Sequence, residues 1–414
     1  MNSASQQTET VAKGATPHQA DGLMATLAQR VAARRVLAID AFRGLTILVM
    51  IFVNTLAGVR GMPAWLDHES AGVDGMTFPD VVFPAFLFIV GMSIPFALGQ
   101  RIAAGDGWWP LQRHILARAA GLLVLGVFMV NAEEGYNEQA MHMSIYLWCL
   151  LFYACAILVW NVYRMRSKVL ATSLRLCGVA GLALLASLFR GGPHGELHLA
   201  PQWWGILGLI GWAYLYACVF YQLTRGRLAP LLAVLACCVG YWCAAHQGWL
   251  WAGQMDNAAH SSIALSGVVC AMIFFGADDK RLRRRYIEAA ALVLALALTA
   301  WLLRPWFHIS KIEATPSWCL YSAAICVTLF GALYSLIDLQ RVQAWTGFFR
   351  PAASNPLLTY IIPYIVYALM QYLHLSLPAL LEQGLPGAIW SAAYAIGVMA
   401  VVMVLNRLHI RLRL

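Results

Sequence analysis

Apolar residues recur along the chain in long blocks that short polar segments separate. Each block is roughly 20 residues long, the length of an α-helix that crosses the hydrocarbon core of a bilayer. The pattern predicts an all-α polytopic membrane protein with about 12 transmembrane helices. The blocks cover residues 36–59, 77–99, 112–131, 144–162, 169–188, 203–223, 228–247, 261–277, 286–303, 317–337, 355–373 and 387–405.

The segment before the first block has a different character. Residues 1–34 are polar, begin with a Ser/Thr/Gln-rich stretch, and show no signal-peptide pattern. We therefore expect two parts: a flexible cytoplasmic tail over residues 1–34 and a transmembrane domain over residues 35–414.

Composition supports a membrane protein and argues against a series of soluble domains. Of all residues, 61% are hydrophobic and only 11% are charged, whereas about a quarter are charged in an ordinary soluble domain. The ten cysteines lie within or at the ends of apolar blocks, and none follows the spacing of a zinc site. We interpret them as small packing residues and expect no metal and no nucleic-acid partner.

Basic residues indicate how the helices are oriented. Lys and Arg gather in alternate loops, and loops rich in them stay in the cytoplasm. This places both termini in the cytoplasm. The basic groups are Arg30, Arg34 and Arg35; Arg101 and Arg113; Arg164, Arg166 and Lys168; Arg225 and Arg227; Lys280, Arg281, Arg283, Arg284 and Arg285; Arg341 and Arg350; and Arg407, Arg411 and Arg413.

The opposite loops are acidic. They carry ten acidic and four basic residues. This excess of negative charge would attract cations, including protonated amino sugars. Translocated loops are, however, generally poor in basic residues, which also explains the excess. The acids are Asp67, Glu69, Asp74, Glu133, Glu134, Glu138, Glu196, Asp256, Glu313 and Glu382, and the bases are Arg60, Arg190, Arg304 and Lys311.

Ionisable and amide residues interrupt the first apolar block. Asp40, Arg43 and Asn54 fall within about 60° of one another around a helix, so they predict one polar stripe facing the interior of the bundle. Charged residues at membrane depth are costly and usually functional. Asp40 and Arg43 alone also fit a pair that anchors the helix at the headgroups, but such an anchor does not explain Asn54.

A single histidine lies in the acidic loop before the second block. Nine residues separate His68 from Thr77, which can cap the next helix, and Asp80 follows at the outer face. The two side chains can therefore meet. A histidine oriented by a carboxylate is the usual construction of a general base or nucleophile, although a lone loop histidine is often simply solvated.

The segments IDAFRGLTILVMIFVN and GMTFPDVVFPAFLFIVGMSI, with one histidine between them, resemble the transmembrane acyltransferases related to heparan-α-glucosaminide N-acetyltransferase. Looser similarity covers LAPQWWGILGLIGWAYLY, HISKIEATPSWCLYSA and NPLLTYIIPYIV, and so nearly the whole membrane part. The resemblance to bacterial relatives implies a multi-pass protein of a bacterial inner membrane. It also implies a homodimer.

The resemblance implies acetyl-CoA as the co-substrate and an amino-sugar acceptor outside. His68 corresponds to the family's loop histidine, with Asp80 and Asn54 as its catalytic companions. Asp40, Arg43, Lys311 and Asn355 are then expected to bind the donor. The basic loop offers Arg281 and Arg284 to the nucleotide phosphates, together with Lys280, Arg101 and Arg113.

Several alternatives stay open. His68 either deprotonates the acceptor amine for direct attack or is itself acetylated, and we favour direct transfer. Asp80 is expected to support the imidazolium form, and Asn54 to donate to the oxyanion. An amino-sugar transporter without acyltransferase activity is the rival function, although no inverted repeat is evident. A purely structural membrane protein leaves the intramembrane charges unexplained.

Overall fold

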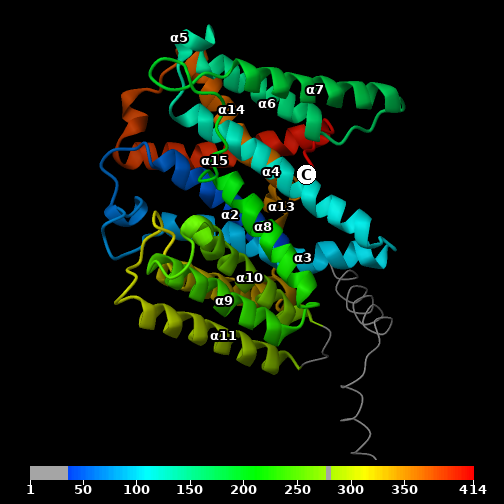
Figure 1. Ribbon diagram of the computed structural model, residues 1–414, viewed down its shortest axis with the longest axis vertical. Coiled ribbons are helices and arrows are strands. Elements are labelled where there is room, and N and C mark those ends of the chain that lie inside the picture. The colour runs from blue at the N-terminus through cyan, green and yellow to red at the C-terminus, as the bar shows by residue number, and fades with distance from the viewer. Residues whose placement is uncertain (1–35, 277–280) are drawn as a thin grey trace, which may run out of the picture.

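The protein forms a bundle of α-helices (Figure 1); the computed structural model describes residues 36–276 and 281–414. No β-strand occurs in these two ranges, which contain only isolated bridges. The predicted tail over residues 1–34 lies outside the described residues. The principal helices are α2 (Leu37–Leu56), α3 (Val82–Ala103), α4 (Trp108–Glu133), α6 (Ile145–Trp160), α7 (Lys168–Leu188), α8 (Ile206–Leu223), α9 (Leu228–His246), α10 (Met255–Phe275), α11 (Leu282–Leu303), α12 (Pro316–Tyr334), α13 (Thr346–Ser354), α14 (Pro356–Tyr372) and α15 (Gly384–Arg407).

The fold class predicted from the sequence is confirmed, and each apolar block overlaps one of these helices, although several helices extend beyond their block. Within the described residues, ten helical segments are long and apolar enough to cross a membrane. The pair α13 and α14, bent by 83°, raises this number to eleven. Helix α6 is apolar but has only 16 residues. The count of twelve crossings therefore stays a prediction.

Helix α10 occupies the middle of the bundle. Of its most apolar stretch, 89% is buried, compared with 17% for α7 and 22% for α11, which lie at opposite extremes of the bundle (Figure 1). Helices α10 and α3 approach very closely at Gly91 and Gly267, where a side chain on either would meet the backbone of the other helix. Small residues at a helix crossing allow this approach in membrane proteins.

The loops form two groups at opposite ends of the bundle. At one end Gly75 N–H donates to Ile309 O over 3.2 Å, and at the other Val162 N–H donates to Arg411 O over 2.9 Å. This grouping agrees with the alternation of charge in the sequence. The acidic end comprises loops 57–78, 134–144, 189–205, 247–254, 304–315 and 373–383, and the basic end comprises loops 104–107, 161–167, 224–227 and 340–345 with segment 408–414.

Helices α13 and α14 meet at a sharp break. Asn355 lies between them with non-helical φ and ψ values of −141° and 57°, and Pro356 opens α14. Broken helices at membrane depth persist where the exposed backbone lines a cavity or is packed in protein. Here the break lies beside α2, because Phe349 of α13 packs directly on Gly44.

Candidate active site

His68 and Asp80 form a hydrogen-bonded pair at the acidic end. The distance between His68 Nδ1 and Asp80 Oδ1 is 2.7 Å. His68 belongs to loop 57–78, and Asp80 to the short helix η3 (Pro79–Val81) that leads into α3. The Asp80 side chain is 1% exposed and that of His68 is 36% exposed. The pair therefore presents an imidazole to its surroundings while the carboxylate that orients it stays buried.

The second carboxylate oxygen fixes the orientation of Asp80. Asp80 Oδ2 accepts hydrogen bonds from the Glu69 N–H at 3.2 Å, the Thr77 N–H at 3.0 Å and the Thr77 hydroxyl at 3.0 Å. The indole N–H of Trp318, on α12, donates to the Asp80 carbonyl at 3.1 Å. Because both carboxylate oxygens have donors, the side chain is held in one rotamer as an acceptor.

Lys311 completes the cluster. Its Nζ atom lies 3.0 Å from His68 Nδ1, 3.4 Å from His68 Nε2 and 3.8 Å from Asp80 Oδ1. Burial lowers the pKa of Lys311 below its ordinary value, and the nearby Asp80 carboxylate acts in the opposite direction. The sequence assigned Lys311 to donor binding, whereas the structure places it against the imidazole.

The partners of His68 indicate its tautomer. His68 Nδ1 lies closer to Asp80 Oδ1, at 2.7 Å, than to Lys311 Nζ, at 3.0 Å. Because an ionised Asp80 can only accept hydrogen bonds, we assign the proton of a neutral His68 to Nδ1. Its Nε2 atom then keeps a lone pair and can take a proton from an attacking group. The arrangement provides a general base with an orienting carboxylate and an adjacent cation.

Loop 304–315 clamps the loop that carries His68. Asp74 accepts hydrogen bonds from Arg304 Nε at 2.9 Å and from the Ile309 N–H at 2.8 Å. The Ile309 N–H, and then Arg304, lower the pKa of Asp74, although its partial burial raises it. His308 Nε2 lies 3.1 Å from the Ala71 carbonyl and adds a second link between the two loops.

A compact turn sets the position of Lys311 itself. Thr315 caps α12: its hydroxyl oxygen accepts from the Trp318 N–H at 3.5 Å and from the Ser310 N–H at 3.0 Å. The Ser317 hydroxyl donates to the Phe307 carbonyl at 2.6 Å. The pattern Lys-x-x-x-Thr-Pro-Ser therefore forms a turn through these local bonds, and the turn holds the Lys311 ammonium group near the start of α3.

A cavity of about 560 Å³ penetrates the bundle from the basic end. Val36 lines it near that end, and Met50 and Phe86 line it further along α2 and α3. The 14 residues from Val36 to Met50 correspond to roughly 21 Å of helix. From Phe86 back to Asp80 is a further rise of roughly 9 Å. This space, called the central cavity below, extends most of the way to the His68 cluster.

Three arginines, Arg43, Arg118 and Arg413, line the central cavity. Arg43 donates to the Ser93 hydroxyl at 2.7 Å, and its Nη1 atom lies 3.4 Å from both Asp40 Oδ1 and the Ala353 carbonyl. The Arg118 guanidinium lies 4.9 Å from the centre of the Tyr214 ring, and its buried Nε atom has no hydrogen-bond partner among the described residues. The cavity therefore offers positive charge and unsatisfied donors to an anionic or carbonyl-bearing ligand.

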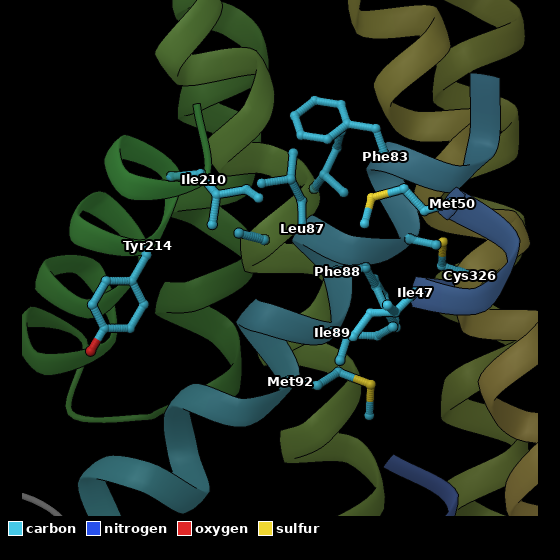
Figure 2. Packing of buried hydrophobic residues seen from close by; sticks show 14 of the residues in the cluster. Ile47, Met50, Phe83, Leu87, Phe88, Ile89, Met92, Ile210, Tyr214 and Cys326 are labelled. Atoms are coloured by element: carbon cyan, nitrogen blue, oxygen red, sulfur yellow. The ribbon is translucent and has the colours of Figure 1, made fainter. Parts of the chain in front are cut away.

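Packed apolar side chains lie between the central cavity and the His68 cluster. Figure 2 shows Met50, on α2, close to Phe83 and Leu87, on α3. Met50 lines the cavity, whereas Phe83 does not, and Phe83 lies one helical turn from Asp80. Transfer between the two places would pass this apolar layer.

Asn54 differs from its expected position. Its side chain is exposed and does not line the central cavity, so the prediction that the whole stripe faces the interior is wrong. Asp40 and Arg43 do line the cavity. The difference has a geometric reason: α13 has only nine residues and packs on α2 near Gly44, so it does not cover the same face of α2 at the level of Asn54.

Asn355 is buried and fully engaged with the protein. Its Nδ2 atom donates to Asn406 Oδ1 at 3.0 Å and to the Ile410 carbonyl at 3.1 Å, and its Oδ1 atom accepts from the Leu412 N–H at 3.1 Å. It thus anchors segment 408–414 beside the helix break. Because its amide is occupied by these bonds, Asn355 would affect binding of the acyl donor only indirectly.

The basic loop before α11 lies apart from the central cavity. Arg284 pairs with Glu288 one helical turn away at 3.0 Å, and neither Arg281 nor Arg284 lines the cavity. Arg101 pairs with Asp106 at 2.6 Å. Lys280 lies outside the described residues.

The sequence interpretation missed several residues of these sites. Thr77 and Trp318 support Asp80, and their roles depend on contacts that spacing alone does not reveal. Ser93 and Arg118 line the central cavity. Arg118 could have been identified from the sequence, because a charged residue inside the apolar block 112–131 is as unusual as Arg43 inside the first block. In residues 36–276 and 281–414, no group of three or more His, Cys, Asp or Glu side chains is arranged to hold a metal.

Comparison with known proteins gives a consistent result. Residues 35–228, just under half of the chain, match a family described as "Domain of unknown function (DUF5009)". A segment of 119 residues is 34% identical to mouse (Mus musculus) heparan-alpha-glucosaminide N-acetyltransferase. The chain is similar to this acetyltransferase. A segment of 97 residues is 33% identical to the human (Homo sapiens) protein of the same name.

These matches confirm the resemblance seen in the two opening segments. They cover 28% and 23% of this chain, and only 17% and 14% of the mouse and human acetyltransferases. The chain therefore matches only about a sixth of the mouse relative and about a seventh of the human relative.

Proposed function

We propose that the protein is a transmembrane acetyltransferase that moves an acetyl group from acetyl-CoA to an amine or hydroxyl group of a sugar. The main support is one spatial arrangement. A cavity containing Arg43 and Arg118 runs from the basic end toward an oriented His68 at the acidic end. The similarity to heparan-alpha-glucosaminide N-acetyltransferases supports the reaction class.

The distribution of charge supports a sidedness for this reaction. Basic loops face the cytoplasm, so acetyl-CoA would enter the central cavity from inside a bacterial cell. The acceptor would approach His68 from the periplasm, where acidic loops attract a protonated amino sugar. Asp40 and Arg43 would then border the path of the acyl-bearing arm.

The proposed chemistry uses His68 as the general base. His68 Nε2 takes a proton from the acceptor ammonium group, and the nitrogen of the resulting amine attacks the thioester carbonyl; its second proton passes to the departing thiolate. The new C–N bond forms as the C–S bond breaks, and the departing thiolate receives a proton to leave as coenzyme A thiol. Asp80 stabilises the imidazolium. Lys311 would stabilise negative charge on the carbonyl oxygen, the role that the sequence assigned to Asn54.

Direct transfer is favoured over an acetyl-histidine intermediate. The His68 side chain is 36% exposed, so an acyl-imidazole there would be open to hydrolysis. A single complex that spans the membrane avoids this exposed intermediate. Acid-quench trapping of label on the protein, with acetyl-CoA and no acceptor, distinguishes the two routes.

The test uses purified protein in nanodiscs with radiolabelled acetyl-CoA and glucosamine. We expect labelled N-acetyl sugar from the wild type, and a loss of about 10²- to 10⁴-fold in His68→Ala, the contribution of a general base. Acetyl-CoA binding should be retained. His194→Ala, an exposed histidine at the same end, is the matched control. Equal turnover by His68→Ala and the wild type would exclude His68 from the mechanism.

A transporter is the second candidate, because a layout of about twelve helices with both ends inside is common among transporters. Proteoliposomes preloaded with acetyl-CoA separate the two functions. Acetylation of added glucosamine supports the enzyme, whereas uptake of unmodified glucosamine that ignores acetyl-CoA would overturn the proposal.

A further inference from the structure

A second cavity at the basic end contains an unusual concentration of arginines. It measures about 740 Å³ and lies between α13, the end of α15 and segment 408–414. We call it the arginine cavity. Its charged and polar lining consists of Arg350, Ser354, Asn406, Arg407, His409, Arg411 and Arg413.

Within the described part of the chain, none of these four arginines has an ion-pair partner for its charge. In residues 36–276 and 281–414, no ion pair or hydrogen bond is formed by the side chains of Arg350, Arg407, Arg411 or Arg413. The Nε atom of Arg411 is buried and unsatisfied. Arg350, Arg407 and Arg413 are exposed and Arg411 is partly buried, and all four line one concave space.

The backbone of segment 408–414 holds two of the arginines in position. Arg411 N–H donates to Asn161 Oδ1 at 3.0 Å, and Arg413 N–H donates to the Trp160 carbonyl at 2.9 Å. Leu412, the residue between these two arginines, donates its N–H to Asn355 Oδ1. In an extended segment, residues two apart share a face. The fold thus presents Arg411 and Arg413 together.

The arginine cavity adjoins the central cavity. Ser354 and Arg413 line both. A single ligand can therefore place an anionic head among the arginines and extend a thin arm toward Arg43. Guanidinium groups grip phosphate through paired, charge-assisted hydrogen bonds, so a head with several phosphates matches this lining best.

We propose that the arginine cavity is a phosphate-binding site that holds the adenosine 3′,5′-bisphosphate end of the acyl donor. The assignment rests on the proposed function, because it places the remainder of the same donor in the central cavity. It also moves phosphate recognition away from Arg281 and Arg284, which line neither cavity. The same chemistry would serve the phosphate of an anionic phospholipid, and the experiment separates these sources.

The test measures binding of adenosine 3′,5′-bisphosphate to full-length protein in phosphatidylcholine nanodiscs. The double variant Arg407→Gln/Arg411→Gln should weaken binding about tenfold or more, as expected for the loss of a charge-assisted hydrogen bond. The double variant Arg281→Gln/Arg283→Gln removes equal charge at the same end and should change binding less than about twofold. Arg411→Lys keeps the positive charge, so it should bind the bisphosphate more tightly than the double variant Arg407→Gln/Arg411→Gln. Unchanged elution on gel filtration shows that each variant is folded.

The remaining outcomes have distinct meanings. Equal weakening in both double variants, or no weakening in either, overturns the site. If the bisphosphate does not bind, but phosphatidylglycerol raises the melting temperature only when Arg407 and Arg411 are present, the site serves a lipid and the donor assignment fails. Arginine-dependent bisphosphate binding without sugar acetylation keeps this site while refuting the proposed function.

Discussion

Replacing Asp80 with Asn tests the orientation of His68 with a minimal change in shape. The carboxylate accepts from His68 at Oδ1 and from three donors on Glu69 and Thr77 at Oδ2. An amide has one acceptor oxygen, which we expect to remain with the three loop donors. Its NH₂ group then faces His68 Nδ1, which must become an acceptor, so the proton moves to Nε2 and the general base is lost.

The expected magnitudes follow from these contacts. Loss of general-base catalysis should reduce kcat/KM for acetyl transfer by about 10²- to 10⁴-fold. The three remaining bonds change from charge-assisted to neutral at a cost of about 1 kcal/mol each, so the melting temperature should fall. Acetyl-CoA affinity should change little, because Asp80 lies roughly 9 Å along the helix from the nearest part of the central cavity on α3.

The assay measures initial rates with radiolabelled acetyl-CoA, together with donor binding and thermal unfolding. Glu313→Gln is the matched control: an exposed carboxylate in the loop that carries Lys311, facing His308 and not His68. Its rate should stay within about threefold of the wild type, as for most surface substitutions. Retention of more than a third of wild-type kcat/KM by Asp80→Asn would refute the proposed role of the pair.

Three further predictions address the central cavity, the loop clamp and the orientation. Arg43→Gln should weaken acetyl-CoA binding about tenfold, while Arg101→Gln should not; equal affinities would remove Arg43 from the donor site. Because its pKa is lowered in the folded protein, Asp74 stabilises the fold above pH about 4 and loses this effect on further acidification. Asp74→Asn should therefore lower the melting temperature slightly at pH 7. It should also reduce the fall of the melting temperature below pH about 4, and a fall as large as in the wild type would contradict the stabilising role of Asp74. In a cysteine-free background, Ser70→Cys should react with impermeant maleimide on intact cells and Ser167→Cys only after permeabilisation; the opposite labelling would invert the orientation.

The sequence alone determines the helices and their class. Each block is apolar over a length that only a helix can carry across a bilayer, since every backbone group must be satisfied within the segment. The pairing of His68 with Asp80 was also predictable, because a short loop leaves the two side chains little freedom to separate. The alternation of basic and acidic loops predicted which loops lie at the same end of the bundle, and the hydrogen bonds between loops agree with it.

Tertiary structure decided which polar groups share a site. Lys311 reaches His68 from 243 positions along the chain, and the arginine cavity joins α13 to segment 408–414. Helical periodicity placed Asn54 beside Arg43 on one face, but the coverage of that face depends on the length of α13, a helix from a distant part of the chain. Local pattern fixes where a side chain points on its own helix, and only the packing of other helices decides whether it meets a cavity, a partner or the surroundings.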